Sequence, residues 1–315
     1  MDAPEVFIES RKKPLADVPE MGIGNKPIDG GHYLFTTEEK EAFVKREPAA
    51  EQYFRPWYGA QEFLHNSPRW CLWLGDCTSA QLHAMPRCLE RVRAVREYRL
   101  ASPSEGTRRL ADTPTRFHVE NMPASGHYLL VPRVSSERRP YVPIGFMDTG
   151  TIASDAVQII PSATLSHFAV LTSSVHMAWM RAVCGRLKSD YRYSASVVYN
   201  NFPWPGGMAS ASEAQQAGSA GGLARTAEDT AALERCAQNI LDARALYPDS
   251  SLADLYDPLT MPAELRKAHR DNDREVLRLY GLPADATDEQ IVAKLFTMYA
   301  DQLERRRPAC DHCKT

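Results

Sequence analysis

Residues 185–205 begin with charged side chains of both signs and end in an uncharged stretch closed by Pro-Trp-Pro. Lys188, Asp190 and Arg192 stand at alternate positions, so an extended loop would carry all three on one face. Lysine donates to the O6 and N7 acceptors of guanine, and aspartate accepts from the amino group of the paired cytosine. The spacing predicts that Lys188 and Asp190 read one G·C pair, with Arg192 reaching a neighbouring base or phosphate. The alternative is a surface ion pair of little energetic value.

A second set of residues has the chemistry to bind phosphate. Residues 127–134 and 141–147 read as two strands joined by a tip at 135–140, and prolines at 132, 140 and 143 favour a sheet edge. Arginine, lysine, serine and tyrosine are common donors to DNA phosphates. Such side chains occur at this tip, around the 188–192 loop and in the three-cation run at 11–13. We predict phosphate or groove contacts by Arg133, Ser135, Ser136, Arg138, Arg139, Arg186, Tyr191, Tyr193, Lys12 and Lys13.

The positive charge of the chain is concentrated in its middle third. The net charge of −3 over 315 residues does not indicate a generally basic nucleic-acid binder. Residues 87–192, however, contain 15 Lys and Arg against 9 Asp and Glu, a net of +6, whereas residues 1–86 carry −4 and residues 206–315 carry −5. A DNA-facing surface needs its positive charge in one region, and the middle third is where this sequence supplies it.

Part of that charge lies on a helix predicted after Pro86. Apolar residues recur at three-residue steps along one face of this helix, at positions 89, 92, 95 and 98. Arginines occupy much of the remaining helix surface, at positions 87, 91, 93, 96 and 99. This pattern is typical of a solvated amphipathic helix. The functional alternative is that some of these arginines follow a phosphate backbone.

Other elements are predicted from local patterns. The apolar run 69–74 reads as a buried strand, and 157–160, 6–10 and 196–199 read as further strands. Helices are expected at 37–46 and at 165–184, with a capping box at 78–81. We expect Trp179 to be a core residue rather than a base-stacking platform. Beyond a Gly/Ala/Ser-rich stretch, Thr226, Pro262 and the capping box at 287–290 begin three more helices.

Long parts of this sequence resemble the MmeI-like adenine-specific DNA methyltransferases, which are single-chain restriction–modification enzymes. Residues 173–194 and 199–205 look like the end of their target recognition domain, and the similarity continues in 68–74, 132–139, 143–146 and 251–262. The resemblance implies sequence-specific binding of double-stranded DNA and methylation of an adenine, in some cases with endonuclease activity. It also implies a role for Lys188 and Asp190, because charge-reversed Glu-x-Arg pairs occur at the matching positions and go with the opposite base.

The sequence departs from this family in its catalytic motifs. It has no Asn-Pro-Pro-Tyr/Phe motif, and the glycines at 22–24 are too close together for an S-adenosylmethionine loop. The stretch Asn-Asn-Phe-Pro at 200–203 is similar only loosely, since a phenylalanine stands before the proline. We therefore expect no catalytic residue and no cofactor in this chain. S-adenosylmethionine is implied for a longer parent enzyme, whose methyltransferase domain would be a partner together with double-stranded DNA.

The patterns and the resemblance predict a mixed α/β (α+β) target recognition domain with a twisted sheet, followed by a small all-α domain. We place a connector from the catalytic domain at 1–50, the recognition domain at 51–205, a flexible linker at 206–226 and the helical domain at 227–315. The chain shows no signal peptide and no apolar run of the ~20 residues that a membrane span needs. Its seven cysteines suggest free thiols, and we expect a bacterial cytoplasmic protein associated with the nucleoid.

Two other classes of function remain open at this stage. A protein-interaction scaffold could present the same basic region to an acidic partner, but its binding would lack the steep logarithmic salt dependence of phosphate contacts. A zinc protein is suggested by Cys310, His312 and Cys313. A closed structural zinc site needs four ligands, and no second Cys/His pair lies at a suitable spacing, so we expect no metal. His167 and His176 are expected to be packed residues rather than ligands.

Overall fold

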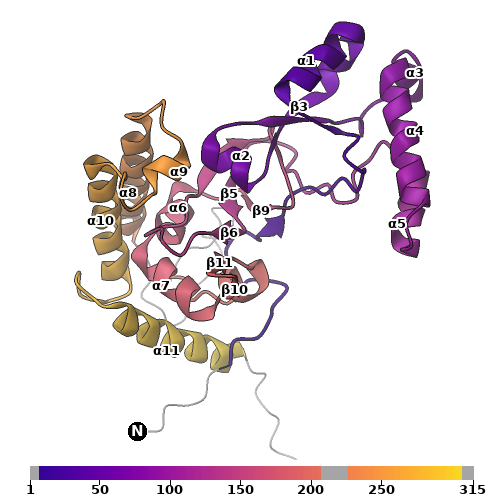
Figure 1. The fold of residues 1–315 in the computed structure, drawn as a ribbon. Helices are drawn as coiled ribbons and strands as arrows, with labels where there is room; N and C mark the ends of the chain where they lie inside the picture. The colour runs from indigo at the N-terminus through magenta and orange to yellow at the C-terminus, as the bar shows by residue number, and fades with distance from the viewer. Residues whose placement is uncertain (1–6, 207–225, 307–315) are drawn as a thin grey trace, which may run out of the picture. The chain divides into compact units, whose positions relative to one another are not determined.

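The computed structural model describes residues 7–206 and 226–306, and its chain divides into two compact units (Figure 1). The N-terminal unit comprises Gly22–Leu130 and Phe146–Ile159. The C-terminal unit comprises the described parts of Met1–Met21, Val131–Gly145 and Ile160–Thr315. The predicted linker falls largely outside the described residues, and so do Cys310, His312 and Cys313.

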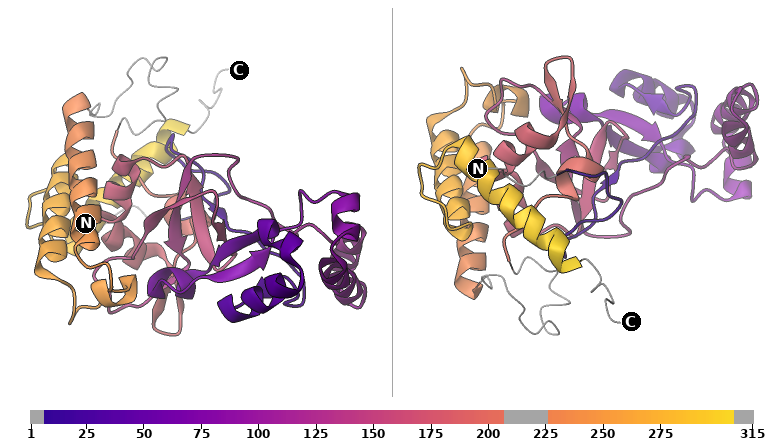
Figure 2. Two further views of the ribbon diagram at one scale, coloured as in Figure 1. Left: turned by 90° about the horizontal axis from the view of Figure 1, so that it is seen from above. Right: turned by 90° about the horizontal axis from the view of Figure 1, so that it is seen from below.

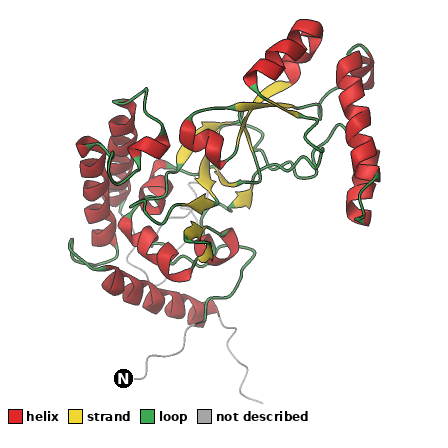
Figure 3. Ribbon diagram, viewed as in Figure 1, coloured by secondary structure: helices red, strands yellow, loops and turns green. Residues whose placement is uncertain are grey.

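The described strands form three sheets (Figure 3). Two have four strands, in the orders β1-β9-β5-β7 and β2-β4-β3-β8, and the third has three, in the order β10-β11-β6. The strands are β1 (Gly22–Ile23), β2 (Leu34–Phe35), β3 (Phe54–Tyr58), β4 (Arg69–Leu72), β5 (His127–Pro132), β6 (Val134–Ser135), β7 (Gly145–Asp148), β8 (Ile152–Ala153), β9 (Val157–Pro161), β10 (Gly185–Leu187) and β11 (Asp190–Arg192).

The helices differ in length between the two units. Those of the N-terminal unit are α1 (Thr37–Arg46), α2 (Ala60–His65), α3 (Ser79–His83), α4 (Pro86–Leu100) and α5 (Glu105–Arg109), with 3₁₀ turns at Pro48–Tyr53 and Leu110–Asp112. Those of the C-terminal unit are α6 (Leu165–Leu171), α7 (Ser174–Val183), a π-helical turn at Ala195–Tyr199, α8 (Ala227–Ala245), α9 (Leu252–Leu255), α10 (Ala263–Leu279) and α11 (Asp288–Arg306).

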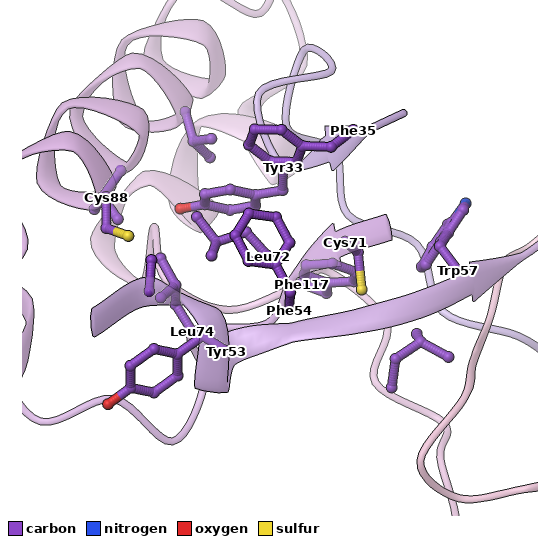
Figure 4. Packing of buried hydrophobic residues seen from close by; sticks show 14 of the residues in the cluster. Tyr33, Phe35, Tyr53, Phe54, Trp57, Cys71, Leu72, Leu74, Cys88 and Phe117 are labelled. Carbon is purple, nitrogen blue, oxygen red and sulfur yellow. The ribbon is translucent and has the colours of Figure 1, made fainter. Parts of the chain in front are cut away.

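The core of the N-terminal unit lies on the sheet that contains β3 and β4 (Figure 4). The apolar run predicted as a buried strand forms β4, between β2 and β3, and its Leu72 is completely buried. Aromatic side chains meet around it, with Phe35 and Phe54 in an edge-to-face contact at 5.1 Å and Trp73 against Phe117 at 4.9 Å. Such pairs add to the stability that the burial of apolar area already provides.

The capping boxes predicted from the sequence are confirmed. The Thr78 hydroxyl accepts from the backbone N–H of Gln81, and Gln81 Oε1 accepts from that of Thr78; Thr287 and Gln290 form the same pair before α11. The helix expected at 37–46 forms as α1, with Thr36 as the N-cap residue. In each case a hydroxyl and a carboxylate or amide oxygen accept backbone N–H groups that would otherwise lack a partner at the helix start.

One arginine of α4 is buried. This was not predicted, because the arginines of this helix were expected on its solvated surface. The Arg99 side chain is 1% exposed and donates to five backbone carbonyl oxygens. Phosphate tracking by Arg99 is therefore excluded in this fold. Arg87, Arg93 and Arg96 are exposed as expected, whereas Tyr98, predicted to point inward, is 49% exposed.

The helix predicted at 165–184 is interrupted in the structure. It consists of α6 and α7, and the break falls at Thr172 and Ser173. The Ser173 hydroxyl accepts from the backbone N–H of His176 and so caps α7 as a separate helix. Serine competes with the helix backbone in this way, and the apolar periodicity that suggested one helix does not record it.

The strand predicted at 196–199 is wrong, because this segment forms the π-helical turn. Side chains from elsewhere hold its carbonyl groups. Asn201 Nδ2 donates to the carbonyls of Ser196 and Val197, and Trp179 Nε1 donates to that of Val198. Trp179 is completely buried, so the prediction that it is a core residue is confirmed. Acceptors used in this way are not available to a strand ladder.

Asn200 and Asn201 hold the N-terminal segment in place. A strand was predicted at 6–10, but the described part of this range, residues 7–10, forms none. Asn200 Nδ2 donates to the carbonyl of Arg11, and Asn201 Nδ2 donates to that of Glu9. Arg11 Nε donates back to Asn201 Oδ1 at 2.9 Å. The N-terminal segment is thus fixed by side-chain amides rather than by a sheet.

The three predicted C-terminal helices are confirmed as α8, α10 and α11. Leu233 and Ile240 of α8 and Leu295 of α11 are completely buried. In the C-terminal unit, α8 packs on α10 and on α6, and α11 packs on α7 (Figure 2). Gly281, with φ +66°, follows the end of α10 in the left-handed conformation that favours glycine.

His176 lies inside the C-terminal unit and should make its stability depend on pH. Burial lowers the pKa of His176 to about 3, and its Nε2 lies 2.8 Å from Tyr193 Oη. Below pH ~6.5 the unfolded chain binds a proton at this residue that the folded chain does not bind. We expect the free energy of unfolding to fall by about 1.4 kcal/mol per pH unit from this group as the pH drops from 6 to 4.

Urea unfolding between pH 4 and 7.5 measures this dependence. The variant His176→Gln has no titrating group at this position. Its free energy of unfolding should therefore change less steeply with pH, by about 1.4 kcal/mol per pH unit, because the carboxylates contribute equally to both proteins. Identical slopes for the two proteins would contradict the prediction.

Candidate nucleic-acid interface

Two stretches that the sequence indicated separately meet in the small sheet β10-β11-β6. Tyr191 of β11 pairs with Ser135 of β6, and β10 and β11 form an antiparallel hairpin. The hairpin predicted from 127–134 and 141–147 is therefore only partly correct. Its strands β5 and β7 are neighbours in the larger sheet, but residues 134–135 leave that sheet and join β11. Since β5 lies between β9 and β7, it is an interior strand and not an edge strand.

The predicted reading residues lie on a tight hairpin rather than on an extended loop. Leu187 pairs with Asp190, which leaves Lys188 and Ser189 as a two-residue turn. The backbone of Lys188 has φ +57°, the left-handed conformation that such turns require at this position. Asp190 and Arg192 keep alternate positions on β11 and so share a face, whereas Lys188 projects from the tip. Lys188 and Arg192 are exposed, and Asp190 is half-buried.

Arg186, predicted as a phosphate contact, also has partners within the protein. Its guanidinium lies over the Tyr191 ring at 4.0 Å and donates to the carbonyl of Ser189 at 2.8 Å. It also lies 3.5 Å from the Glu137 carboxylate. The arginine thus ties the hairpin turn to the loop after β6, although about 44% of its side chain remains exposed for a further partner.

Three of the predicted phosphate contacts are corrected by their burial. Tyr191 and Tyr193 are 6% and 3% exposed, and the Tyr193 hydroxyl is engaged with His176. Ser135 is 3% exposed, and its hydroxyl is enclosed by the protein. The alternation of side chains along β11 and β6 explains this, since Tyr191 and Ser135 face the interior. His167 and His176 are buried, which confirms that they are packed residues.

The turn after β6 presents two arginines in different environments. Ser136 forms the turn, because its Oγ accepts from the backbone N–H of Arg138 and its carbonyl accepts from that of Arg139. Arg138 is exposed, whereas Arg139 is half-buried. Burial lowers the pKa of Arg139, while the nearby carboxylates of Asp190 and Asp257 act in the opposite direction.

The remaining predicted contacts lie in less regular backbone. Arg133 is half-buried, and its carbonyl accepts from the backbone N–H of Tyr193 at 2.8 Å. Lys12 and Lys13 are exposed, and Lys13 Nζ is paired with Glu20 at 2.9 Å. An exposed ion pair of this kind is weak and exchanges readily for a phosphate.

The exposed part of this sheet and turn is suited to an anionic groove. Arg138, Arg186, Lys188 and Arg192 are exposed cations, and the half-buried Asp190 shares a face of β11 with Arg192. Cations alone would bind any duplex, whereas a carboxylate that accepts a hydrogen bond from a base amino group discriminates between base pairs.

The side chains that hold the loop after this turn were not predicted from the sequence. Tyr141 hydrogen-bonds to Asp273, and Arg181 and Arg244 donate to loop carbonyls. A signal for part of this set was present, since His269 and Asp273 stand four apart on a predicted helix. Their partner in the loop could not be identified without the fold.

The described residues contain no group of three or more His, Cys, Asp or Glu side chains arranged to hold a metal ion. Among the helices of residues 7–206 and 226–306, none combines the length and apolar character needed to cross a membrane. The described cysteines are free thiols, as predicted: Cys71, Cys77, Cys88, Cys184 and Cys236.

The described residues form a mixed α/β part with a charged hairpin, followed by a helical part. Residues 2–206 match the family model of the MmeI target recognition domain, and residues 226–305 match that of the MmeI C-terminal domain. The chain belongs to the MmeI family. The predicted mixed α/β fold followed by an all-α region is thereby confirmed.

Two relatives are similar over nearly the whole chain. The solved structure of the Type IIL restriction-modification enzyme MmeI in complex with DNA is 42% identical, with a TM-score of 0.87, over 96% of this chain and 38% of that one. DNA methyltransferase A of Bacillus subtilis (strain 168) is 34% identical over 304 residues, which cover 96% of this chain and 32% of that protein. This chain therefore spans between 32% and 38% of the length of these relatives.

Proposed function

We propose that this chain reads the sequence of double-stranded DNA for an N6-adenine DNA methyltransferase. It holds the duplex so that the target adenine reaches a methyltransferase domain of the same polypeptide. The observation that carries the proposal is the sheet β10-β11-β6, in which exposed Lys188 and Arg192 adjoin the turn that carries Arg138. The sheet thus combines a cationic surface with a carboxylate at a hairpin tip, the chemistry of base readout.

The relatives support this proposal. One is a restriction-modification enzyme whose structure was solved with DNA, and the other is named a DNA methyltransferase. A methyltransferase takes its target base out of the stack, so another part of the enzyme must hold the duplex while this happens. We propose that this chain has that role in the bacterial cytoplasm, at the nucleoid. S-adenosylmethionine is then a cofactor of the parent enzyme, and this chain alone transfers no methyl group.

The exposed residues divide into two proposed roles. Lys188 and Asp190 read bases from the hairpin tip, with Arg192 beside them on β11. Phosphate contacts come from the exposed or half-buried side chains among those predicted, which are Arg133, Ser136, Arg138, Arg139, Arg186, Lys12 and Lys13. Base contacts specify the site, and phosphate contacts fix the register of the protein on the duplex.

Binding measured in rising salt tests the proposal directly. The chain should bind one duplex sequence better than others, and the logarithm of its affinity should fall linearly with the logarithm of salt concentration. Its alternative is a scaffold that presents a basic face to an acidic protein. Binding to duplexes without any sequence preference, or a nearly flat salt dependence, would favour that scaffold.

Replacing both Arg138 and Arg139 by alanine should weaken binding to all duplexes about equally. The two side chains sit on the turn after β6 and act through phosphates, so the salt slope should become shallower by roughly 1–2. Fluorescence anisotropy with several duplexes at several salt concentrations measures both quantities.

A matched control is Arg266→Ala with Lys267→Ala, which removes two neighbouring exposed cations from α10. This pair should leave the slope unchanged. A changed sequence preference in the Arg138/Arg139 variant would mean instead that these arginines read bases.

A further inference from the structure

The nine-residue loop 136–144, between β6 and β7, has two halves with different surroundings. Its first half is the turn that carries Arg138 and Arg139. Its second half is attached to helices of the C-terminal unit through Pro140, Tyr141 and Ile144. The position of the arginines therefore depends on how the second half is held.

Tyr141 is held at both its hydroxyl and its ring by one helix. Its hydroxyl donates to Asp273 Oδ2 at 2.6 Å. Its ring stacks on His269, with centroids 4.0 Å apart and an interplanar angle of 18°. His269 and Asp273 stand four residues apart on α10 and so lie on one face of that helix. The two contacts together fix both the direction of the side chain and its distance from α10.

Asp273, which accepts a hydrogen bond from the Tyr141 hydroxyl, also accepts one from the backbone of α7. Its Oδ1 accepts from the backbone N–H of Ser174 at 2.6 Å, in the first turn of α7, where a negative charge is favourable. Burial raises the pKa of Asp273, while the hydrogen bonds from Tyr141 and Ser174 act in the opposite direction. A carboxylate with bonds to both oxygens cannot follow Tyr141 if the loop moves.

His269, on which the ring stacks, is fixed as well. Its Nε2 lies 2.8 Å from the hydroxyl of Tyr256, and Arg244 donates to that same hydroxyl oxygen. The hydroxyl proton is therefore directed at Nε2, which requires a neutral imidazole with Nε2 as acceptor. Burial lowers the pKa of His269, in agreement with this assignment.

Two backbone attachments complete the arrangement. Arg244 Nη1 of α8 donates to the carbonyl of Ile144 at 2.7 Å, and Arg181 Nη2 of α7 donates to that of Pro140 at 3.4 Å. Arg181 is also paired with Asp288, in the first turn of α11, at 2.9 Å. Side chains from α7, α8 and α10 thus contact Pro140, Tyr141 and Ile144, three residues within the stretch 140–144.

We propose that Tyr141 is a positioning residue for DNA binding. Its attachment to Asp273 and His269 makes the C-terminal helices the part of the chain that sets where Arg138 and Arg139 meet the duplex. The inference rests on the proposed function and extends it. It gives the C-terminal helices a part in DNA binding through the loop that they hold in place.

The test uses the full chain, a duplex that it prefers, and anisotropy titrations over a range of salt concentrations. Tyr141→Phe removes the hydroxyl and keeps the stack on His269. We expect weaker binding by up to roughly tenfold and a salt slope shallower by about 1, because an arginine that leaves its place loses a phosphate contact. Asp273→Asn probes the same hydrogen bond from the helix side and should change the slope in the same direction.

The control Tyr247→Phe removes a similar bond, since the Tyr247 hydroxyl donates to Glu264 at 2.7 Å on the surface of the same helices. It should leave affinity and slope unchanged. In a chain that already carries Arg138→Ala and Arg139→Ala, Tyr141→Phe should have no further effect on binding.

The results of these titrations distinguish a failure of this inference from a failure of the proposed function on which it rests. If Tyr141→Phe lowers thermal stability as Tyr247→Phe does but leaves affinity and salt slope intact, Tyr141 is structural and the inference is overturned. If the arginine pair itself contributes nothing to the slope, the proposed phosphate role of this turn fails first. A wild-type chain without preference for any duplex would overturn the proposed function.

Discussion

Replacing Arg99 by methionine should lower the free energy of unfolding by about 3–5 kcal/mol, the largest stability effect that we expect from a single change outside the apolar core. The Arg99 guanidinium is buried and donates to the carbonyls of Pro27, Ile28, Leu110, Thr113 and Arg116. Methionine fills much of the same space but donates no hydrogen bond. Each buried carbonyl that remains without a donor costs about 1–3 kcal/mol, less where water can enter.

Urea unfolding of the two proteins measures the effect, and Arg96→Met is the matched control. Arg96 lies on the same helix, α4, and is exposed. Its replacement should change stability by no more than about 0.5 kcal/mol. Arg99→Lys should recover part of the loss, because an ammonium can reach some of the carbonyls but lacks the planar fork. A loss below about 1 kcal/mol for Arg99→Met would show that the carbonyls find other donors.

Arg99 also shows why a helix can be predicted correctly while the burial of one of its residues is predicted wrongly. The helix forms where it was expected, and Val92 and Val95 face inward as predicted. Position 99 follows them on the same stripe, at helical spacing. The sequence gives no reason to place a charged group there, since arginine is almost never fully buried without partners. The partners lie on two loops, and their carbonyl groups carry no sequence signal.

Local chemistry was sufficient for other elements. The capping boxes, the buried strand β4 and the helices α8, α10 and α11 depend on residues within a few positions of one another, and each was predicted correctly. The pairing of β6 with β11 and the bond between Tyr141 and Asp273 join residues far apart in the sequence. Their side chains are ordinary ones, so only the fold identifies them as partners.

The geometry of the candidate site could not be predicted from the sequence, and the roles of its residues stay predictions. The side chains named for base readout are exposed or half-buried on one small hairpin, where they can serve that role. Tyr191, Tyr193 and Ser135 were assigned to phosphate by residue type alone, and the two-residue alternation of short strands turns them inward. The register of a strand decides which residues face the ligand, and the sequence does not fix the register of such short strands.

Exchanging the charges of Lys188 and Asp190 should change the base preferred at one position of the target site. In the structure Lys188 stands at the tip of the β10–β11 hairpin, and Asp190 is the first residue of β11. The turn keeps both at the end of one narrow hairpin, so they can enter the major groove together and face the two bases of a single pair. Lysine suits guanine, and aspartate suits the cytosine opposite.

The exchange is compatible with the backbone of the turn. Lys188 has φ +57°, which costs any residue except glycine some strain. Glutamate experiences the same strain as lysine there, so Lys188→Glu adds no new backbone cost. Arg192 remains on the same face of β11, so the contact that we propose for it with a neighbouring base or phosphate is kept. The hairpin should therefore fold unchanged, with its charges exchanged in place.

The double change Lys188→Glu with Asp190→Arg, made in a complete methyltransferase that contains this chain, should switch one position from G to C and leave the others unchanged. Either single change should lower activity without a clean switch, because an acceptor would then face an acceptor, or a donor a donor, at one base of the pair. Mapping of the methylated sites measures the outcome, with a discrimination of about 1–3 kcal/mol at the altered position. The matched control Lys267→Glu with Asp271→Arg reverses a surface ion pair on α10 and should leave the target site as it was. An enzyme with normal activity and an unaltered site after the Lys188 and Asp190 exchange would mean that these two residues form a surface ion pair and read no base.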